Sequence, residues 1–176
     1  MKLFRQISSK KLKNLRQQAG FTLVELLVAM GLMGGFLVVL TDIVSTTLDV
    51  QTESESTSAL SEDGRFFLAR LDYDIQRATS ISTPAIIGST ATSLALVIGG
   101  VTHTYAVSGD NLQLANPTGT TNLNSNDTTV SGVSFRKLGN SGGKDTIRAS
   151  FTITSVVQTD QGQDSRSFTT TFGRRQ

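Results

Sequence analysis

The chain has 176 residues and a net charge of +2, which suits one globular domain with an additional segment. Its 38% apolar content excludes wholesale disorder, and the absence of cysteine excludes disulfides and thiolate metal sites. The charge is unevenly distributed, because residues 1–20 hold six of the 16 basic side chains and no acidic one. The other 156 residues therefore hold ten basic and fourteen acidic side chains, a net charge of −4. The basic pI belongs to the first segment, which argues against a general nucleic-acid-binding protein.

An apolar segment follows the basic one. Residues 21–41 contain a single charged side chain, Glu25, and as a helix would span about 31 Å, roughly the hydrocarbon thickness of a bilayer. Basic residues ahead of an apolar span keep that end in the cytoplasm. The sequence therefore predicts a single-pass protein of the inner (cytoplasmic) membrane, with a cytoplasmic N-terminus and the rest of the chain outside that membrane.

Residues 42–80 are expected to continue this helix as an amphipathic segment. They contain no proline and one glycine, Gly64, and apolar residues recur at helical spacing. We expect a kink or frayed turn at residues 51–58, which are rich in Ser, Thr and Glu, and expect Pro84 to close the helical region. The predicted apolar stripe consists of Leu60, Phe67, Leu68, Leu71, Ile75 and Ala78. The charged side chains expected largely off this stripe are Glu62, Asp63, Arg70, Asp74 and Arg77, of which Arg70 and Asp74 are spaced to pair.

The hydrophobic period changes to two after Pro84, so residues 81–176 are predicted to form a globular antiparallel β domain. Strands are expected at 94–98, 101–107, 112–115, 133–138, 147–157 and 166–172. Residues 116–129, rich in Asn, Thr and Ser, are expected to form a loop. The predicted fold class is α+β: a long N-terminal helix, transmembrane in its N-terminal half, packs its apolar stripe on one small antiparallel sheet.

The start of the apolar segment is the most informative part of the sequence. Gly20 lies before the apolar residues and Glu25 lies among them. A carboxylate inside an apolar span is expensive and is usually functional. An ordinary secretory signal has the opposite order, with an uncharged apolar region and then a small-residue cleavage site.

The run Gly20-Phe21-Thr22-Leu23-Val24-Glu25-Leu26-Leu27, with Lys13 and Arg16 upstream, resembles the prepilin cleavage and methylation motif. This motif belongs to type IV pilins, minor pilins and pseudopilins. The resemblance implies a pilin fold and a leader, residues 1–20, that a prepilin peptidase removes between Gly20 and Phe21. It implies that the same enzyme methylates the new amine of Phe21. It also implies a periplasmic or cell-surface filament with other pilin or pseudopilin subunits, an assembly ATPase and an inner-membrane platform protein, and no cofactor.

Glu25 matches the glutamate at the fifth position of the mature chains of that family. Cleavage would expose a positive amine at Phe21, and neither that charge nor the carboxylate is tolerable alone among apolar helices. Glu25 of one subunit can neutralise the Phe21 amine of a neighbour and set their axial register. The alternative is an uncleaved signal anchor with an incidental glutamate.

Three glycines lie in the middle of the span, Gly31, Gly34 and Gly35. They either let the helix extend as subunits leave the bilayer, or allow close helix packing within the membrane.

Residues 61–78 resemble the region after the anchor in J-type pseudopilins and W-type minor pilins, although any amphipathic helix covering a sheet would explain them equally well. The chain lacks the C-terminal cysteine pair of many major pilins and has no proline in residues 21–41. Both features favour a minor pilin or pseudopilin over a major pilin. Whether the machine is a pilus, a type II secretion system or a competence apparatus stays open.

A membrane-anchored hydrolase is the remote alternative. It would use His103, the only histidine, in a triad with a serine and an acid, but the sequence contains nothing that identifies the nucleophile. The glycine-rich turn at 139–145 lacks the P-loop spacing. The polar loop has oxygen donors for calcium but no EF-hand spacing. We therefore expect a structural protein and not an enzyme, with no metal.

Basic residues near one turn of the β domain leave a further function open. They are Arg136, Lys137, Lys144 and Arg148, and Arg174 and Arg175 follow near the last residue. They could contact DNA or an acidic face of another subunit, as in a pilus-borne adhesin or DNA-uptake subunit. A solvated sheet edge, protected from aggregation by its charges, is the preferred interpretation, so no nucleic-acid partner is expected.

Overall fold

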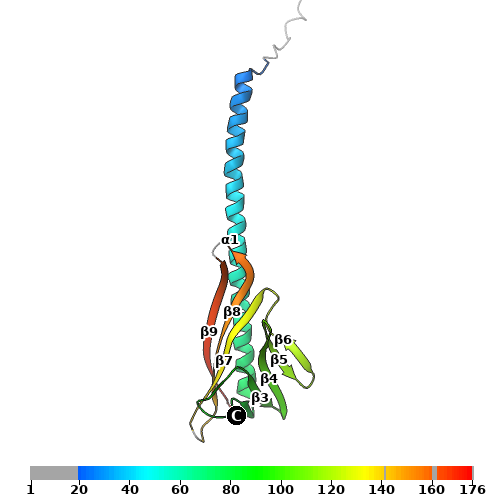
Figure 1. Ribbon diagram of the computed structural model, residues 1–176, viewed down its shortest axis with the longest axis vertical. Helices are drawn as coiled ribbons and strands as arrows, with labels where there is room; N and C mark the ends of the chain where they lie inside the picture. Colours follow the sequence, from blue (N-terminus) through cyan, green and yellow to red (C-terminus); the bar gives the residue numbers. More distant parts are fainter. Residues whose placement is uncertain (1–19, 141, 160–161, 176) are drawn as a thin grey trace, which may run out of the picture. The chain divides into compact units, whose positions relative to one another are not determined.

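The computed structural model describes residues 20–140, 142–159 and 162–175, so residues 1–19 of the predicted leader lie outside the described residues. The chain divides into two compact units, Met1–Thr46 and Thr47–Gln176. One long helix, α1 (Leu23–Arg77), begins in the first unit and ends in the second. Antiparallel strands make up the rest of the second unit (Figure 1). The predicted α+β class, a long N-terminal helix packed on antiparallel strands, is confirmed.

Helix α1 is continuous through residues 51–58, where a kink or frayed turn was expected. Side-chain hydrogen bonds, one within the helix and one to a β-strand, are made by this segment. The Thr52 hydroxyl donates to the Leu48 carbonyl at 2.9 Å, and the buried Ser56 hydroxyl donates to Asp164 of a β-strand at 3.0 Å. Tertiary contact thus compensates for the poor helix propensity of these residues.

The end of α1 corrects a second expectation, because the helix ends at Arg77 and not near Pro84. A short strand, β1 (Ser80–Thr83), lies between them and pairs with the strand at residues 94–98. Pro84 disfavours the helical region for Thr83, and Ile81 is buried by the pairing. The proline therefore follows a strand and not a helix.

The strands form two sheets where one was expected. The order in the five-stranded sheet is β1-β3-β4-β5-β6, and in the four-stranded sheet it is β2-β7-β8-β9. The first contains β3 (Leu94–Ile98), β4 (Val101–Ser108), β5 (Asn111–Asn116) and β6 (Gly119–Asn122) besides β1. The second contains β2 (Thr90–Ala91), β7 (Thr128–Leu138), β8 (Thr146–Thr159) and β9 (Gly162–Gly173).

Residues 116–129 were expected to form a loop but contain β6 and the start of β7. The Asn116 side chain explains the reversal before β6, because its oxygen accepts hydrogen bonds from the backbone N–H groups of Thr118 and Gly119. All four residues of β6 are exposed, so this strand has no apolar alternation that a sequence pattern could detect.

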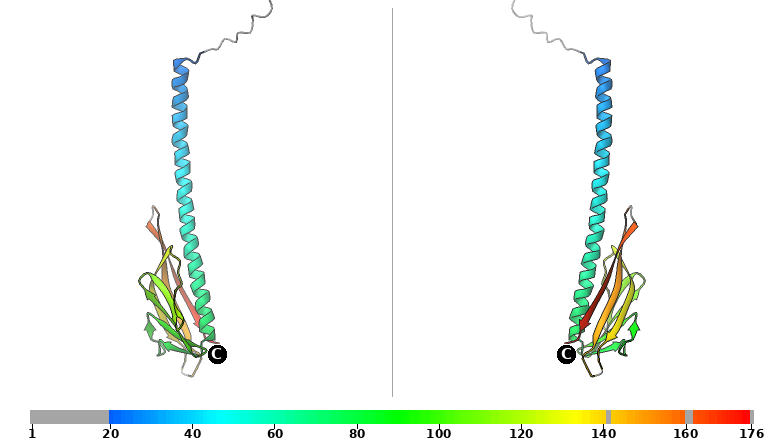
Figure 2. Two further views of the ribbon diagram at one scale, coloured as in Figure 1. Left: turned by 90° about the vertical axis from the view of Figure 1, so that its right-hand side faces the viewer. Right: turned by 90° about the vertical axis from the view of Figure 1, so that its left-hand side faces the viewer.

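The core lies between the C-terminal part of α1 and both sheets. The predicted stripe is confirmed, since Leu60, Phe67, Leu71, Ile75 and Ala78 are buried and Leu68 packs against them. Figure 2 shows the strands gathered along one side of this part of the helix. Phe67 meets Phe151 of β8 edge-on at 5.5 Å between ring centroids, and Phe168 of β9 stacks on Phe151 at 5.3 Å.

Two aspartates expected off the stripe are instead buried. Asp63 accepts hydrogen bonds from the Ser125 backbone N–H at 3.1 Å, the Ser125 hydroxyl at 2.9 Å and the Thr128 hydroxyl. Asp74 accepts from the Tyr105 hydroxyl and from Arg70 Nε at 3.0 Å. Both positions lie at helical spacing from stripe residues, so helix geometry places them inward and strand residues satisfy them.

The buried Tyr105 makes alkaline stability a test of this arrangement. Burial, and then the hydrogen bond to Asp74, raise the pKa of the Tyr105 hydroxyl above its ordinary value of 10.0. The unfolded chain therefore loses this proton near pH 10 while the folded chain keeps it. We expect the free energy of unfolding to be unaffected by this group below pH 10 and to fall above it by about 1.4 kcal/mol per pH unit. Urea unfolding between pH 8 and 11.5 should show this loss, and the Tyr105→Phe variant should lack it.

Candidate functional site: the start of helix α1

The first turn of α1 has a defined N-cap. The backbone N–H of Glu25 donates to the Thr22 hydroxyl at 3.3 Å, and the Leu26 N–H donates to the Thr22 carbonyl at 3.1 Å. Thr22 followed three residues later by Glu25 is the capping-box spacing. Thr22 is a residue of this site that was not predicted, although its spacing of three from Glu25 is a signal present in the sequence. The cap fixes Leu23 as the first helical residue.

The Gly20–Phe21 bond lies just outside the helix. Gly20, Phe21 and Thr22 are non-helical, and all three are exposed. Phe21 is 77% exposed. Exposed, irregular backbone beside a helix end is the kind of segment on which proteases act.

Glu25 lies in the first helical turn, where the helix dipole favours a negative charge. Every residue from Phe21 to Val50 is exposed within the chain, including the large apolar side chains. An apolar surface of this extent requires an apolar environment, such as lipid or other helices. By length and composition, α1 contains one stretch able to cross a membrane.

Two threonine hydroxyls of α1 find acceptors within the helix itself. The hydroxyl of Thr41 donates to the Leu37 carbonyl and that of Thr46 to the Asp42 carbonyl, each at 2.9 Å. These bonds remove the need for water at two side chains.

The glycines Gly31, Gly34 and Gly35 are helical, and a Cβ added at any of them would meet no atom within 4 Å. Packing within the chain therefore does not require them, and both predicted explanations, a softer helix or close approach of a neighbour, stay open.

Comparison with protein families gives one match, the prokaryotic N-terminal methylation motif, over residues 15–40. It covers the Gly20–Phe21 bond, the capped first turn and the three glycines. The chain is type IV pilin-like. Searches of curated proteins and of solved structures give no match for the chain.

The match supports a pilin-like precursor of the kind that a prepilin peptidase processes and that assembles with other pilin subunits. Together with the exposed apolar helix, it indicates membrane anchoring. The motif family is structural and not enzymatic. The match does not separate J-type from W-type or other subtypes.

His103, the residue on which a hydrolase would depend, lines an open cavity of about 760 Å³ in the globular unit of this pilin-like chain. Asp74 lines the same cavity, but its carboxylate already accepts hydrogen bonds from Tyr105 and Arg70. None of the described residues that line the cavity is a serine. The arrangement thus lacks the nucleophile that a Ser-His-Asp triad requires.

The predicted basic cluster is divided by the structure. Lys137 is buried, and its ammonium lies 3.3 Å from the carboxylate of Asp145, whereas Arg136 and Arg148 are exposed. Alternation along a strand explains the division, because neighbouring residues face opposite sides of the sheet. Arg136 and Arg148 lie on β7 and β8, the central strands of their sheet, so the expectation of a charged sheet edge was wrong.

Asn124, in the segment between β6 and β7, forms hydrogen bonds that stabilise the fold. Its side chain accepts from the Leu112 N–H at 3.1 Å and donates to the Thr128 carbonyl at 2.7 Å. No cluster of His, Cys, Asp or Glu able to hold a metal ion occurs among the described residues.

Proposed function

We propose that the chain is a non-enzymatic structural subunit, a minor pilin or pseudopilin, of a type IV pilus or type II secretion-like filament. The observation that carries the proposal is an apolar helix surface, exposed from Phe21 to Val50, that starts directly after the Gly20–Phe21 bond and has one carboxylate in its first turn. Such a surface suits a subunit that waits in the inner membrane and then joins a bundle of like helices.

In this proposal the leader, residues 1–20, is cut after Gly20 on the cytoplasmic side, and the amine of Phe21 is methylated. Residues 21–41 form the membrane span and later the filament core, residues 42–80 the amphipathic continuation, and residues 81–176 the extracytoplasmic β domain. A platform protein in the inner membrane receives the subunit during assembly.

Glu25 is proposed to pair with the Phe21 amine of a neighbouring subunit. The carboxylate is exposed within its own chain and surrounded by apolar side chains, so in a bilayer or a helix bundle it needs an opposite charge from outside the chain. The match of residues 15–40 to the methylation motif supports this pairing.

The absence of cysteine, and of proline in residues 21–41, favours a minor pilin or pseudopilin. A major pilin is the alternative, and an adhesin or DNA-uptake subunit carried on a pilus is another.

Substitution of Glu25 tests the proposal. Glu25→Gln and Glu25→Ala should leave cleavage after Gly20 intact, because the bond lies outside the helix, but should reduce filament-bound subunit at least about tenfold. An unpaired ammonium in an apolar bundle costs several kcal/mol, and each 1.4 kcal/mol is a factor of ten. Mass spectrometry of the mature N-terminus measures processing, and immunoblotting of sheared filaments measures incorporation.

Glu53→Gln is the matched control, since Glu53 is exposed on α1 beyond the apolar residues, and its incorporation should equal that of the wild type. Normal incorporation of both Glu25 variants would refute the role given to Glu25. A recovered chain that still begins at Met1, without a methylated Phe, would refute the whole proposal.

A further inference from the structure

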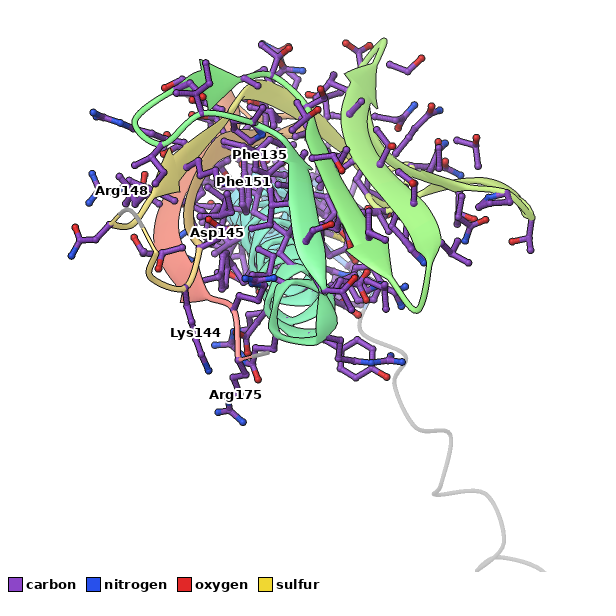
Figure 3. All side chains as sticks on the ribbon, turned by 90° about the horizontal axis from the view of Figure 1, so that it is seen from below. Phe135, Lys144, Asp145, Arg148, Phe151 and Arg175 are labelled. Carbon is purple, nitrogen blue, oxygen red and sulfur yellow. The ribbon has the colours of Figure 1, made fainter. Side chains whose placement is uncertain are left out.

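The cavity beside the end of α1 is lined by three separate segments of the globular unit. Its volume is about 760 Å³, which is within the range of small-molecule sites. The last turns of α1, the hairpin of β3 and β4 with His103, and the turn between β5 and β6 form its walls. Figure 3 shows the labelled cations Lys144, Arg148 and Arg175 on the side of the four-stranded sheet, and none of them lines this cavity.

The helix wall carries a positive charge that the fold does not neutralise. Arg77, the last residue of α1, is exposed and forms no ion pair with a described residue. Its guanidinium lies over the ring of Tyr73, 4.7 Å from the ring centroid, and donates one hydrogen bond to the Tyr73 hydroxyl. The contact with Tyr73 thus holds the guanidinium in place and leaves most of its N–H groups available to a ligand.

The only carboxylate among the described lining residues is already paired. Asp74 accepts hydrogen bonds from the Tyr105 hydroxyl and from Arg70, which lines the cavity as well and forms an ion pair with Asp74 at 3.0 Å. Two arginines and one aspartate give the described lining a net charge of +1 with His103 neutral. A cleft whose lining has one sign of charge attracts ligands of the opposite sign.

Two uncharged polar side chains of the lining are not fully used by the fold. The side-chain oxygen of Asn116 accepts hydrogen bonds from the Thr118 hydroxyl and from the N–H groups of Thr118 and Gly119, which leaves the Asn116 NH2 group as a donor. His103 Nδ1 is buried and has no hydrogen-bond partner among the described residues. Buried polar atoms are normally paired, so the fold itself gives no reason for an imidazole at this position.

Apolar surface lies beside these donors. Ile98, Val101 and Pro117 line the cavity, and Val101 is 39% exposed. Apolar walls with a few convergent polar groups are typical of a site for a small organic ligand. The apolar side chains can pack against the body of such a ligand while Arg77 and Asn116 bind its polar group.

We propose that this cavity binds a small organic oxyanion, a carboxylate or a phosphate monoester. The Arg77 guanidinium presents parallel N–H donors that match two oxygens of either group. A cationic ligand is disfavoured, because Asp74 is already paired with Arg70. A neutral ligand would leave the charge of Arg77 without a partner. The site lies in the globular unit and goes beyond the filament role proposed for the chain.

Three ligands that share one sugar ring test the proposal. Glucuronate carries a carboxylate, glucose 6-phosphate carries a phosphate monoester, and glucose carries neither. His103 is the only histidine, so its labelled imidazole gives a single NMR signal in the full chain in non-ionic detergent. We expect at least one of the two anions to shift this signal saturably, with a dissociation constant of about 0.1–1 mM for a ligand of this size, and glucose to leave it unchanged.

Substitution of Arg77 tests its part in binding. Arg77→Gln should weaken binding at least about tenfold, because it removes the charge-assisted hydrogen bonds to the anion. Arg77→Lys keeps the charge but not the two parallel donors, and its affinity should lie between those of Arg77→Gln and the wild type. Arg65→Gln is the matched control, since Arg65 is an exposed arginine of α1 that does not line the cavity, and it should bind within about twofold of the wild type.

The outcomes separate the two oxyanions and can overturn the proposal. A response to glucuronate alone identifies a carboxylate site, and a response to glucose 6-phosphate alone identifies a phosphate monoester site. No saturable shift with either anion, an equal shift with glucose, or equal affinities of Arg77→Gln and Arg65→Gln would overturn the proposal. Unchanged thermal unfolding of the Arg77 variants shows that a loss of binding is not a loss of folding. The measurement involves no filament, so its failure would leave the filament role untouched.

Discussion

Replacement of Asp74 by alanine is expected to destabilise the globular unit by about 3 kcal/mol. Asp74 is 2% exposed, and its carboxylate accepts hydrogen bonds from Tyr105 of β4 and Arg70 of α1. Alanine would leave the buried Tyr105 hydroxyl without an acceptor, at a cost of about 1–3 kcal/mol, and would remove the partner of Arg70 as well. Urea unfolding of the full chain in non-ionic detergent, followed by tyrosine fluorescence, measures the loss.

Two further variants separate the buried hydrogen bonds from the removal of a charge. Asp72→Ala removes a carboxylate from the same helix, but Asp72 is only half-buried and its partner, Gln76, lies one turn away. We expect this control to cost less than about 1 kcal/mol. Asp74→Leu combined with Tyr105→Phe should recover part of the stability, because it removes donor and acceptor together. Equal losses for Asp72→Ala and Asp74→Ala would contradict the structural role given to Asp74.

Gly64→Ala should also destabilise the globular unit, although alanine is the better helix former. A Cβ at Gly64 would lie 2.2 Å from the ring of Phe168. The ring cannot move freely, since it stacks on Phe151 at 5.3 Å. Alanine in a helix interior gains about 1 kcal/mol over glycine, whereas overpacking costs about 1–3 kcal/mol, so the expected balance is a net loss of up to about 2 kcal/mol.

A double-mutant cycle identifies the steric cause of this loss. Phe168→Leu shortens the side chain that meets the new Cβ, so Gly64→Ala should cost less in that background, with a coupling above about 0.5 kcal/mol. Gly34→Ala, on the same helix with no atom near its Cβ, should leave the unfolding of the globular unit unchanged. Additive effects of Gly64→Ala and Phe168→Leu would show that the two residues do not compete for the same space.

The close approach of α1 to β9 requires a glycine at position 64, a role that the sequence pattern did not predict. In the sequence, Gly64 is recognisable only as the single glycine of residues 42–80. The structure shows that it lies on the buried side of the helix, where the Phe168 ring occupies the space of a side chain. Further hydrogen bonds hold the two elements together, from Ser56 to Asp164 and from Arg166 to Ser61 at 2.9 Å.

The processing motif and the apolar half of α1 were predictable from the sequence, because both depend on neighbours in the chain. Gly20, Phe21 and Glu25 are recognised by their order, the Thr22 cap by a spacing of three, and the stripe from Leu60 to Ala78 by helical period. The α+β class followed from the change of period after Pro84. These features can be recognised without knowing which residues pack against them.

Burial of polar groups was decided by the tertiary structure. Whether Asp63 and Asp74 lie inside depends on hydroxyl donors at Thr128 and Tyr105, which are 65 and 31 residues away. The division into two sheets and the opposite fates of Arg136 and Lys137 likewise depend on strand pairing at long range. Sequence periodicity reports only which side chains share a face, whereas partners from distant strands determine whether a charge on that face is paired in the interior or left exposed.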